Sequence, residues 1–443
     1  SLPINEKCKI AIIGLGYVGL PLAIEFSKNS NCLITGKKLE RKVIGFDISK
    51  KRIDGLRNFY DYTNQFSKKE LKDLKNIEFT LEEKFLKEAD VFIITVPTPI
   101  DEFNIPDLTA LKEASTLVGK ALSKKPNNPK PIVIYESTVF PGATQDVCIP
   151  LLSRFSDLKL NEDYFCGYSP ERINPGDKKN TLTNIVKITS GSNEDAAEWI
   201  NLLYGSIINA GTYKVESIMI AETAKIIENT QRDINIALMN ELSLICNLLK
   251  IDTLDVINAA STKWNFQKYM PGLVGGHCIG VDPYYLTYKS QMVGYYPEVL
   301  LSGRRINDSM GEKIVDQLIS YMLKNSISVL GSDLLILGLT FKENCPDIRN
   351  TGAALIAHKA ISYGFNVDIF DPHVDPEEAK KLYNLELLNG LKKTKKYSAI
   401  IVAVQHNEFK KISNQEWTNL VNDRYVIYDL KGIVPRNLKV IRP

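Results

Sequence analysis

The glycine pattern near the amino terminus constrains the fold more than any other feature of this 443-residue chain. Gly14, Gly16 and Gly19 form a GxGxxG pattern between the apolar stretch Lys9–Ile13 and a stretch with helical spacing that runs through Phe26. In such a strand–turn–helix unit the first glycine permits the tight turn, the second lets the backbone approach a pyrophosphate, and the third lets helix and strand pack closely. The pattern predicts a parallel α/β sheet with a dinucleotide site, and a glycine-rich turn without a cofactor is the alternative.

An acidic residue after the second predicted strand, Val43–Phe46, favours NAD as the dinucleotide. Asp47 lies 33 residues after Gly14, more than the usual interval of about 20, and the polar stretch Ser30–Lys42 accounts for the excess as an insertion. A carboxylate at this place bonds the adenine-ribose hydroxyls and repels the 2′-phosphate of NADP. Arg52, one helical turn further on, is either a solvated helix arginine or a partial offset to that repulsion.

The order of predicted elements indicates two α/β regions with a helical region between them. Alternation of strands and helices runs to about residue 210 and returns after residue 326. Between about Glu216 and Lys250 there is no Pro or Gly, which predicts one helix of about nine turns. Its apolar residues recur at helical spacing: Ile220, Ala224, Ile227, Ile234, Leu238, Leu242, Ile245 and Leu249. We expect two Rossmann-like doubly wound domains, 1–210 and 326–443, joined by a central helical domain, 211–325, that forms a dimer interface; the last domain has no glycine fingerprint of its own.

Composition excludes several classes of function. The net charge of +3 gives no basic field for nucleic acid, and no uncharged apolar run is long enough to span a bilayer. Seven cysteines occur singly, without a CxxC pair or a spacing to the four histidines that suits zinc. We therefore expect no metal site, no nucleic-acid partner and no membrane partner. Unpaired thiols fit the reducing cytoplasm, where we expect the protein to work.

The segment 275–283, GGHCIGVDP, carries the strongest chemical signal in the chain. Paired glycines leave the thiol of Cys278 reachable by a substrate, and Asp282-Pro283 is typical of a helix start. A thiol near a helix amino terminus has a lowered pKa. Cys278 is therefore a candidate nucleophile, with a buried inert cysteine as the alternative. We expect His277 to pack, and Asp282 is either a cap or part of the site.

Polar residues also follow two predicted strands, Val91–Val96 and Ile132–Tyr135. Thr98 and Thr138 would lie at the carboxyl edge where doubly wound sheets bind ligands. Their hydroxyl groups could reach a cofactor ribose or a catalytic water. Ordinary turn chemistry at strand ends explains them equally well.

Lys225, Asn229 and Arg232 have the spacing i, i+4 and i+7 on the long predicted helix. We expect them to share a face that carries none of the charges of Glu222, Glu228 or Asp233. Lys225 and Asn229 could then stabilise an oxyanion or hold a water. A polar surface stripe is the alternative that the spacing alone favours.

Together these motifs resemble those of the UDP-glucose/GDP-mannose dehydrogenases, which oxidise a nucleotide sugar at C6. The resemblance covers nearly the whole chain and is carried by GLGYVGLPLA, YEST, YSPERINPG, AKIIENTQRD, PGLVGGHCIGVDPYYL and FKENCPDIRNT. These motif sequences are most similar to those of the UDP-N-acetylhexosamine 6-dehydrogenases of capsule and O-antigen synthesis, especially the Vi-antigen type. Pro175 stands where the UDP-glucose branch has a second glutamate, and Val281 stands where it has a lysine. Both departures favour a UDP-N-acetylhexosamine; UDP-glucose, UDP-N-acetylmannosamine and GDP-mannose are alternatives, as is an inactive nucleotide-binding scaffold.

The resemblance implies a role for each matching residue. Cys278 would trap the aldehyde as a thiohemiacetal, and Lys225 would donate and accept the proton. Asn229 and Asp282 would organise the oxyanion and the water, and Glu171 would assist thioester hydrolysis, with Thr138 also in the catalytic group. Contacts to NAD are implied for Gly14, Gly16, Tyr17, Val18, Gly19, Asp47, Arg52, Thr98, Thr138 and Arg349. Contacts to the nucleotide sugar are implied for Arg172, Ile173, Lys225, Asn229, Arg232, Lys263, Asn265, Gly272, Phe341, Lys342 and Lys431.

The implied reaction is a four-electron oxidation of an alcohol to a carboxylic acid. Two NAD molecules must act in turn, and a covalent thiohemiacetal would hold C6 between the two hydride transfers. The resemblance assigns the UDP-sugar to domain 326–443 and NAD to domain 1–210. We expect a homodimer or a higher homo-oligomer.

Overall fold

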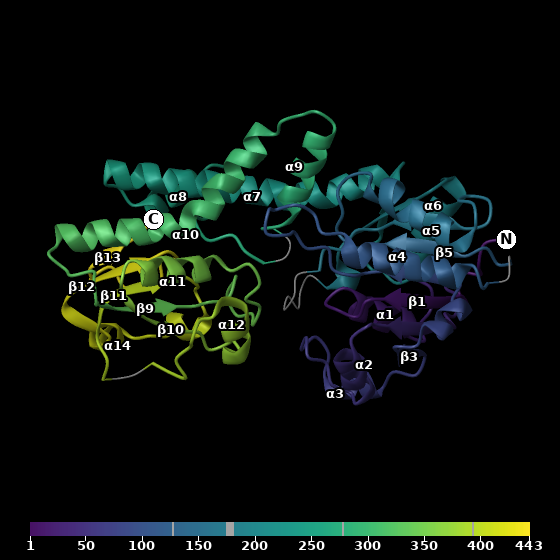
Figure 1. Ribbon diagram of the computed structural model, residues 1–443, viewed down its shortest axis with the longest axis horizontal. Coiled ribbons are helices and arrows are strands. Elements are labelled where there is room, and N and C mark those ends of the chain that lie inside the picture. Colours follow the sequence, from purple (N-terminus) through teal and green to yellow (C-terminus); the bar gives the residue numbers. More distant parts are fainter. Residues whose placement is uncertain (126–127, 174–180, 277–278, 392–393) are drawn as a thin grey trace. The chain divides into compact units, whose positions relative to one another are not determined.

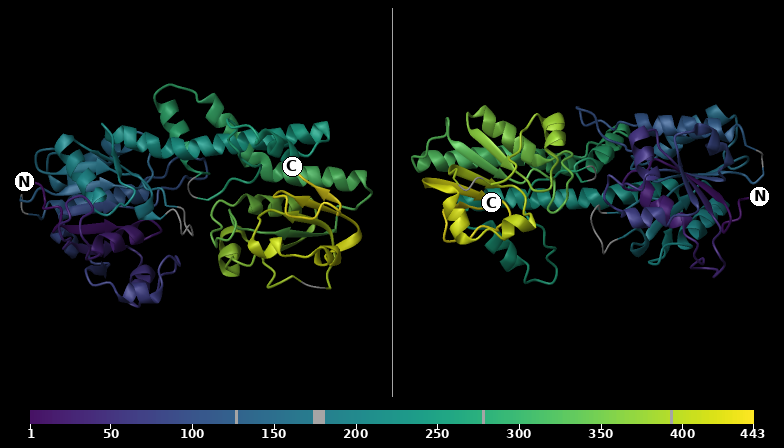
Figure 2. Two further views of the ribbon diagram at one scale, coloured as in Figure 1. Left: turned by 180° about the vertical axis from the view of Figure 1, so that it is seen from behind. Right: turned by 90° about the horizontal axis from the view of Figure 1, so that it is seen from below.

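The computed structural model describes residues 1–125, 128–173, 181–276, 279–391 and 394–443. The chain divides into two compact units (Figure 1). The first comprises residues 1–228 and 284–293, and the second comprises residues 229–283 and 294–443. The division passes through α7 (Ile218–Leu249) and through α9 (Asp282–Met292). Figure 2 shows α7 as one continuous helix, as its lack of Pro and Gly predicted.

An eight-stranded sheet of order β3-β2-β1-β4-β5-β6-β7-β8 forms the first unit. All its neighbouring strands are parallel except β6 and β7, which are antiparallel. The strands are β1 (Lys9–Ile13), β2 (Lys42–Phe46), β3 (Ile77–Thr80), β4 (Val91–Ile94), β5 (Ile132–Tyr135), β6 (Phe165–Tyr168), β7 (Lys187–Gly191) and β8 (Thr212–Lys214). The strand order reverses between β1 and β4, which places a ligand crevice beyond the carboxyl ends of these strands.

Helices cover both faces of this sheet. The helices are α1 (Gly19–Ser27), α2 (Lys50–Arg57), α3 (Lys68–Lys72), α4 (Thr109–Leu122), α5 (Ile149–Ser156) and α6 (Glu194–Gly205), with short helical turns at Glu83–Glu88, Thr144–Cys148 and Leu182–Asn184. Ile10 and Ile12 of β1 share one apolar core with α1, α2 and α6. Alternate strand residues such as Phe92 are buried on the opposite side, where α4 packs beside β4 and α5. Burial on both faces explains why the strands read as continuous apolar runs.

The second unit contains a five-stranded, wholly parallel sheet of order β10-β9-β11-β12-β13. Its strands are β9 (Asp333–Leu337), β10 (Asn366–Phe370), β11 (Tyr397–Val402), β12 (Val421–Asp429) and β13 (Val440–Ile441). Its helices are α8 (Thr253–Ala260), α10 (Glu298–Lys324), α11 (Gly352–Ser362), α12 (Pro376–Tyr383), α13 (Asn407–Lys410) and α14 (Asn414–Asn419). Here the order reverses between β9 and β11, so a second ligand crevice is expected at the carboxyl ends of these two strands.

Two apolar cores flank the second sheet. One joins alternate residues of β9, β11 and β12 to α10 and α11, and the other joins the remaining residues to Phe409 of α13 and Trp417 of α14. Thr351 accepts a hydrogen bond from the backbone N–H of Ala353 and so begins α11. The predicted α/β fold, with two Rossmann-like parallel sheets and a long central helix, is confirmed.

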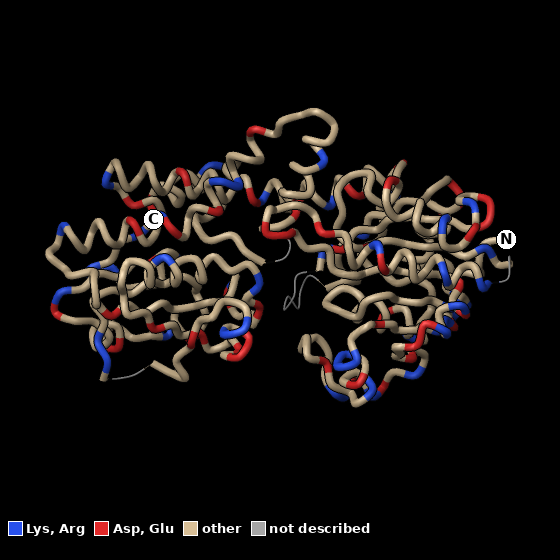
Figure 3. Tube along the Cα trace, viewed as in Figure 1, with Lys and Arg blue, Asp and Glu red and all other residues tan. Residues whose placement is uncertain are grey.

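The hydropathy of the helices and the distribution of charged residues can both be followed along the described part of the chain. Among those residues, no helix is both long and apolar enough to cross a bilayer. Lys and Arg are interspersed with Asp and Glu along the trace of each unit (Figure 3).

Candidate functional site

The glycine turn after β1 has the geometry of a dinucleotide loop. Gly14 has φ +97°, and a Cβ on it would lie 3.2 Å from the carbonyl of Thr95. A Cβ on Gly19 would lie 1.8 Å from the carbonyl oxygen of Gly14. Packing within the chain therefore explains the first and third glycines. A Cβ on Gly16 would meet no described atom within 4 Å, so its lack of a side chain leaves room for a ligand and fits a bound dinucleotide.

Asp47 follows β2 and lies against this turn. Its Oδ2 accepts the backbone N–H of Leu15 at 2.9 Å, and its Oδ1 accepts that of Ser49 at 2.8 Å. The side chain is only half-buried. The carboxylate is thus held at the mouth of the crevice, where it can accept ribose hydroxyls.

Arg52 is buried, so its interpretation as a solvated helix arginine is wrong. Only 1 % of the residue is exposed. Its Nε donates to the carbonyl oxygen of Leu15 at 2.7 Å, and its guanidinium donates to Asp61 Oδ1 at 2.7 Å. Asp61 also accepts backbone N–H groups of Thr63 and Gln65. The charge of Arg52 is therefore paired inside the first unit, and the arginine braces the glycine turn.

The predicted threonines connect the ends of β4 and β5. Thr98 Oγ1 donates to the carbonyl oxygen of Thr138 at 2.6 Å, and Ser137 Oγ donates to that of Val96 at 2.7 Å. The hydroxyl of Tyr285 in α9 donates to the carbonyl of Thr98 at 2.8 Å. These bonds hold both threonines at the carboxyl edge of the first sheet, as expected from their positions after the strands.

Glu171 and Lys225 are buried acid and base of the first unit. Glu171 follows β6 and is 9 % exposed, and Lys225 of α7 is 3 % exposed. Burial raises the pKa of Glu171 to about 7, although the positive charges of Lys225 and Lys187 oppose the rise. Glu171 Oε1 has no hydrogen-bond partner among the described residues. A carboxyl group of this kind can take and release a proton near neutral pH.

A buried ion pair that the sequence analysis missed lies beside Glu171. Lys187 donates to Glu136 Oε2 at 2.7 Å and to the carbonyl oxygen of Pro170 at 3.1 Å, and Tyr204 donates to Glu136 Oε1. Both charged side chains are at most 4 % exposed. The pair fixes the backbone that leads into Glu171. A glutamate directly after a fully apolar strand was the signal that could have found it.

Arg172 and Ile173 follow at the end of the described segment and are half-buried. Arg172 Nε lies 2.9 Å from Glu228 Oε2. Glu228 is therefore the partner of a predicted substrate-binding residue.

In the second unit, Asn229 and Asp282 meet across 53 residues of sequence. Asn229 Nδ2 donates to Asp282 Oδ2 at 2.5 Å, and neither residue is exposed. Asn229 Oδ1 has no partner among the residues that the structure describes. α9 begins at Asp282, which agrees with the helix start predicted from Asp282-Pro283. Cys278 and His277 lie outside the described residues.

The two glycines before Cys278 lie against the 339–350 loop that follows β9. A Cβ on Gly276, which has φ +80°, would lie 2.9 Å from the ring of Phe341. The N–H of Gly276 donates to the carbonyl oxygen of Arg349 at 3.0 Å. The guanidinium of Arg349 is itself bound to Asp347, with Nε 3.0 Å from Oδ1. Lys342 follows Phe341 in the same loop and is half-buried.

Gly272 is held by the long helix and lies next to Lys431. Asn240 Nδ2 donates to the carbonyl oxygen of Gly272 at 2.9 Å, and Asn240 Oδ1 accepts its N–H at 2.8 Å. A Cβ on Gly272 would lie 2.8 Å from Lys431 Nζ. Burial lowers the pKa of Lys431, against the opposing charge of Glu343. Arg232, Lys263 and Asn265 are exposed.

The expected face of α7 was wrong in one respect. Glu222 and Asp233 are fully buried with Lys225 and Asn229, at spacings that put all four on one side of the helix. Glu222 accepts the backbone N–H groups of Gly142 and Thr144, and Asp233 binds Arg304. Hydrogen bonds to distant segments therefore let two acids share the buried face, and helical spacing alone does not reveal such contacts.

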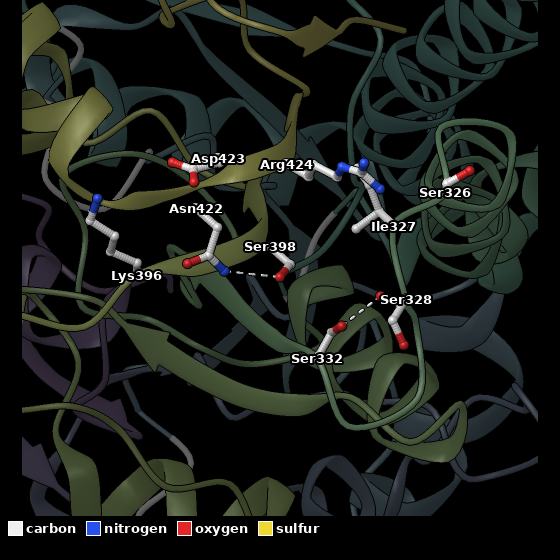
Figure 4. Close-up of a pocket in the computed structure, with 9 residues that line it drawn as sticks. All are labelled: Ser326, Ile327, Ser328, Ser332, Lys396, Ser398, Asn422, Asp423 and Arg424. Atoms are coloured by element: carbon white, nitrogen blue, oxygen red, sulfur yellow. Dashed lines mark hydrogen bonds between the residues drawn. The ribbon is translucent and has the colours of Figure 1, made fainter.

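The second unit has a surface cavity of about 460 Å3 that lies away from the carboxyl ends of the strands of its sheet. Its lining comes from the segment before β9 and from the first residues of β11 and β12 (Figure 4). These are the amino ends of parallel strands, whereas Phe341 follows the carboxyl end of β9. Among the described residues, no group of three or more His, Cys, Asp or Glu could hold a metal ion.

The sequence matches one protein family over most of its length. Residues 8–208 match the NAD binding domain of the UDP-glucose/GDP-mannose dehydrogenase family, residues 219–309 match its central domain, and residues 335–436 match its UDP binding domain.

Individual relatives cover the whole chain. A UDP-N-acetyl-D-glucosamine 6-dehydrogenase of Salmonella typhi is 53% identical over 99% of both chains. One of Pseudomonas aeruginosa is 51% identical over 99% of this chain and 100% of the relative. The solved structure of a UDP-D-ManNAc dehydrogenase from Pyrococcus horikoshii is similar with a TM-score of 0.84 at 28% identity, and the match covers 98% of both chains.

Proposed function

Because the chain belongs to the UDP-glucose/GDP-mannose dehydrogenase family, we propose that it is an NAD-dependent 6-dehydrogenase of a UDP-N-acetylhexosamine. The substrate would be UDP-N-acetylglucosamine or its galacto epimer, and the product would be the corresponding uronic acid. The two relatives above 50% identity carry the first of these activities in their names. Pro175 and Val281 depart from the UDP-glucose branch in the same direction.

The observation that carries the proposed chemistry is the buried bond between Asn229 and Asp282. The amide belongs to Asn229, four residues after Lys225, and the carboxylate belongs to Asp282, four residues after Cys278. A scaffold that only bound a nucleotide would have no need of an amide–carboxylate pair at zero exposure. An oxyanion site or a bound water would use it.

Each reacting group then has a place in the reaction. NAD, when bound, accepts a hydride at each of the two oxidations. Lys225 would take the proton of the C6 hydroxyl in the first. The thiolate of Cys278 would add to the aldehyde, and loss of a second hydride would leave a thioester on its sulfur.

Hydrolysis of the thioester requires a base. Glu171, with its pKa raised to about 7, would take a proton from water as the water attacks the thioester carbon. The C–S bond breaks, the uronate leaves, and the thiol recovers its proton. Arg172, Ile173, Arg232, Lys263, Asn265, Gly272, Phe341, Lys342 and Lys431 would contact the nucleotide sugar. Gly14, Gly16, Tyr17, Val18, Gly19, Asp47, Arg52, Thr98, Thr138 and Arg349 would contact NAD.

A second copy of the chain would cover the exposed apolar face of α7. Ile220, Ile227, Leu238, Ile245 and Leu249 are 46%, 48%, 55%, 48% and 64% exposed. They lie at helical spacing along a helix of 32 residues. We name this face the α7 stripe and propose that it forms a homodimer, because an apolar stripe of this length is typical of an interface. Segment 211–325 would thus join a 1–210 NAD-binding domain to a 326–443 UDP-sugar-binding domain.

The cellular setting follows from the same reaction. We propose that the enzyme works in the cytoplasm and supplies a uronic acid nucleotide for surface polysaccharide synthesis. The six described cysteines are all unpaired and buried, which suits a reducing compartment.

A panel of sugar nucleotides tests the proposal. Purified protein would be given NAD with UDP-N-acetylglucosamine, UDP-N-acetylgalactosamine, UDP-N-acetylmannosamine, UDP-glucose or GDP-mannose, and NADH would be followed by absorbance. We expect the two named N-acetylhexosamines to exceed UDP-glucose in kcat/KM by roughly 10–200-fold, since a pocket shaped for an acetamido group loses contacts when a hydroxyl replaces it. UDP-glucose as the best substrate would overturn the assignment of the sugar, and no turnover with any of the five would overturn the activity.

A further inference from the structure

The turn after β9 repeats the geometry of the glycine turn after β1. Gly338 has φ +95°, close to the +97° of Gly14. The N–H of Gly338 donates to the carbonyl oxygen of Phe370 at 2.9 Å, as that of Gly14 does to Phe46. The second sheet therefore keeps the first glycine of the fingerprint, and Thr340 stands in the place of the second.

The acid of the dinucleotide site is also repeated, but its oxygens are used inside the fold. Asp371 follows β10, and its Oδ2 accepts the N–H of Leu339 at 2.7 Å and that of Thr340 at 3.1 Å. His406 Nε2 lies 2.9 Å from the same oxygen. In the first unit, Asp47 has no such partner among its described contacts and is half-exposed. An imidazole thus fills the place that a ribose would take.

Both ring nitrogens of His406 are engaged. Nδ1 accepts the backbone N–H of Asn344 at 2.9 Å, and Nε2 also lies 3.2 Å from Thr340 Oγ1. Because the Asn344 group is a donor, Nδ1 carries no proton, and Nε2 donates to Asp371. Thr340 Oγ1 in turn donates to the carbonyl oxygen of Lys342 at 2.8 Å. The imidazole is wholly buried and ties the 339–350 loop to the end of the sheet at two points.

The far end of the 339–350 loop supports the glycines before Cys278. Asn350 Nδ2 donates to the carbonyl oxygen of Gly276 at 3.1 Å, in addition to the bond from the Gly276 N–H to Arg349. A Cβ on Gly275 would lie 2.5 Å from the carbonyl oxygen of Asn350. A shift of the loop by a few tenths of an ångström would therefore move this backbone as well.

We propose that His406 is a positioning residue for the substrate half of the site. By binding Asp371, Thr340 and Asn344 it sets the 339–350 loop, and the loop sets both Phe341–Lys342 and the Gly275–Gly276 backbone that leads to Cys278. The imidazole occupies the place beside Asp371 that a ligand would take. The nucleotide sugar is therefore bound by the 339–350 loop and not by Asp371 at the end of β10. The kinetic test of this role rests on the proposed function, whereas the test by hydrogen exchange needs no substrate and does not.

Two isosteric variants separate the bonds of the imidazole. In His406→Asn the side-chain oxygen lies near the place of Nδ1 and can still accept from Asn344, whereas in His406→Gln the amide lies near the place of Nε2 and can still donate to Asp371. His373 is the matched control: its ring lies beside that of His406 with centroids 4.7 Å apart, but the two rings are tilted by 44° rather than stacked face to face, and His373 binds Glu408 and not the loop. His373→Gln removes a neighbouring imidazole without touching the proposed contacts.

Hydrogen exchange of the intact protein tests the inference without substrate. We expect amides of 339–350 and 272–276 to exchange about five- to tenfold faster in His406→Gln, the change that loss of one buried hydrogen bond gives. In His406→Asn the amide of Asn344 should exchange at a rate between those of His406→Gln and wild type. His373→Gln should show wild-type exchange rates in both segments. Wild-type exchange of either segment in His406→Gln would overturn the proposal.

Steady-state kinetics then distinguish positioning from general stability. His406→Gln should raise KM for the UDP-N-acetylhexosamine by about tenfold and change KM for NAD far less, because all of the residues proposed to contact NAD except Arg349 lie in the first unit. Equal changes in both constants, or unchanged KM for the sugar, would overturn the positioning role. If the wild-type enzyme oxidises no sugar nucleotide, the proposed function fails, and the exchange of 272–276 still decides this inference.

Discussion

At the scale of single residues, the fold brings the pKa of the Glu171 carboxyl group close to neutral pH. Burial raises its pKa from the ordinary 4.5 to about 7. Because the pKa is raised, folding takes up a proton between those two values, and the free energy of unfolding falls as the pH rises through that window. Above pH 7 the folded protein holds a buried carboxylate, which is the form that a base requires.

Glu171→Gln should therefore separate stability from activity. We expect the variant to unfold at a higher temperature than wild type at pH 8, where it avoids the buried charge, and to lose about 10²- to 10⁴-fold in kcat. In wild type, kcat should rise with pH through about 7, and the variant should lack that rise. Glu162→Gln, an exposed acid on the same segment of chain, is the control. An unchanged pH profile in Glu171→Gln would show that another group is the base.

Cys278→Ala should abolish turnover and leave NAD binding intact, because the glycine turn is formed by a distant segment of the sequence, residues 14–19. The alanine side chain can form neither the thiohemiacetal nor the thioester. Isothermal titration with NAD would measure binding, and NADH absorbance would measure turnover. Full steady-state activity in the variant would contradict the covalent mechanism.

At the scale of elements, strands and long helices could be predicted from the sequence because buried segments have recognisable patterns of apolar residues. β1 consists of the apolar run Ile10–Ile13 with Lys9 before it, and β5 coincides with its apolar run. α7 occupies the stretch without Pro or Gly. Contacts between distant segments leave no such pattern. Helical spacing alone could not show that hydrogen bonds to Gly142 and Thr144 allow Glu222 to be buried.

The candidate site shows the same limit. Asp47 and the glycines were found because their spacing and place after a strand are local. The bond between Asn240 and Gly272 joins residues 32 apart, and the acid that binds Arg52 lies in a loop without periodicity. Only the fold brings such pairs together.

The paired charge of Arg52 predicts a strict preference for NAD. Because Asp61 pairs with the arginine, Arg52 does not offset the repulsion between Asp47 and a 2′-phosphate. We expect kcat/KM for NAD to exceed that for NADP by at least about tenfold, or about 1.4 kcal/mol. Asp47→Asn should lower the ratio, and Asp54→Asn on α2 is the control with the same charge change. Equal use of the two cofactors by wild type would show that Asp47 is misassigned.

The α7 stripe predicts the state of assembly. Glutamate at both Leu238 and Ile245 would bury two charges in the interface, so we expect Leu238→Glu/Ile245→Glu to be monomeric where wild type is at least dimeric. Light scattering coupled to gel filtration measures the mass. Leu382→Glu, a similarly exposed leucine of α12, should keep the wild-type mass. A wild-type monomer, or an unchanged mass in the double variant, would remove the stripe from the interface.

At the scale of the whole molecule, the two Rossmann-like sheets carry different parts of a dinucleotide site. The first keeps three glycines and an accessible acid, which fits a dinucleotide. The second keeps one glycine and an acid whose oxygen is bound by His406. With one such dinucleotide turn among the described residues, the two proposed oxidations would use it in succession, with the sugar retained between them.

Succession at one site predicts the stoichiometry of the reaction. If Cys278 holds C6 through both oxidations, each UDP-N-acetylhexosamine consumed should yield two NADH and one uronate, with no free aldehyde. Absorbance counts NADH, chromatography counts the uronate, and an added hydroxylamine trap detects aldehyde that escapes. Cys278→Ser is the informative variant, since its hydroxyl can add to the aldehyde but is a poorer nucleophile and leaving group. It should therefore stall within a single slow turnover, either after the first NADH or, after the second, as a serine ester. One NADH per sugar in wild type, or trapped aldehyde in amounts that match the NADH, would contradict retention on the thiol.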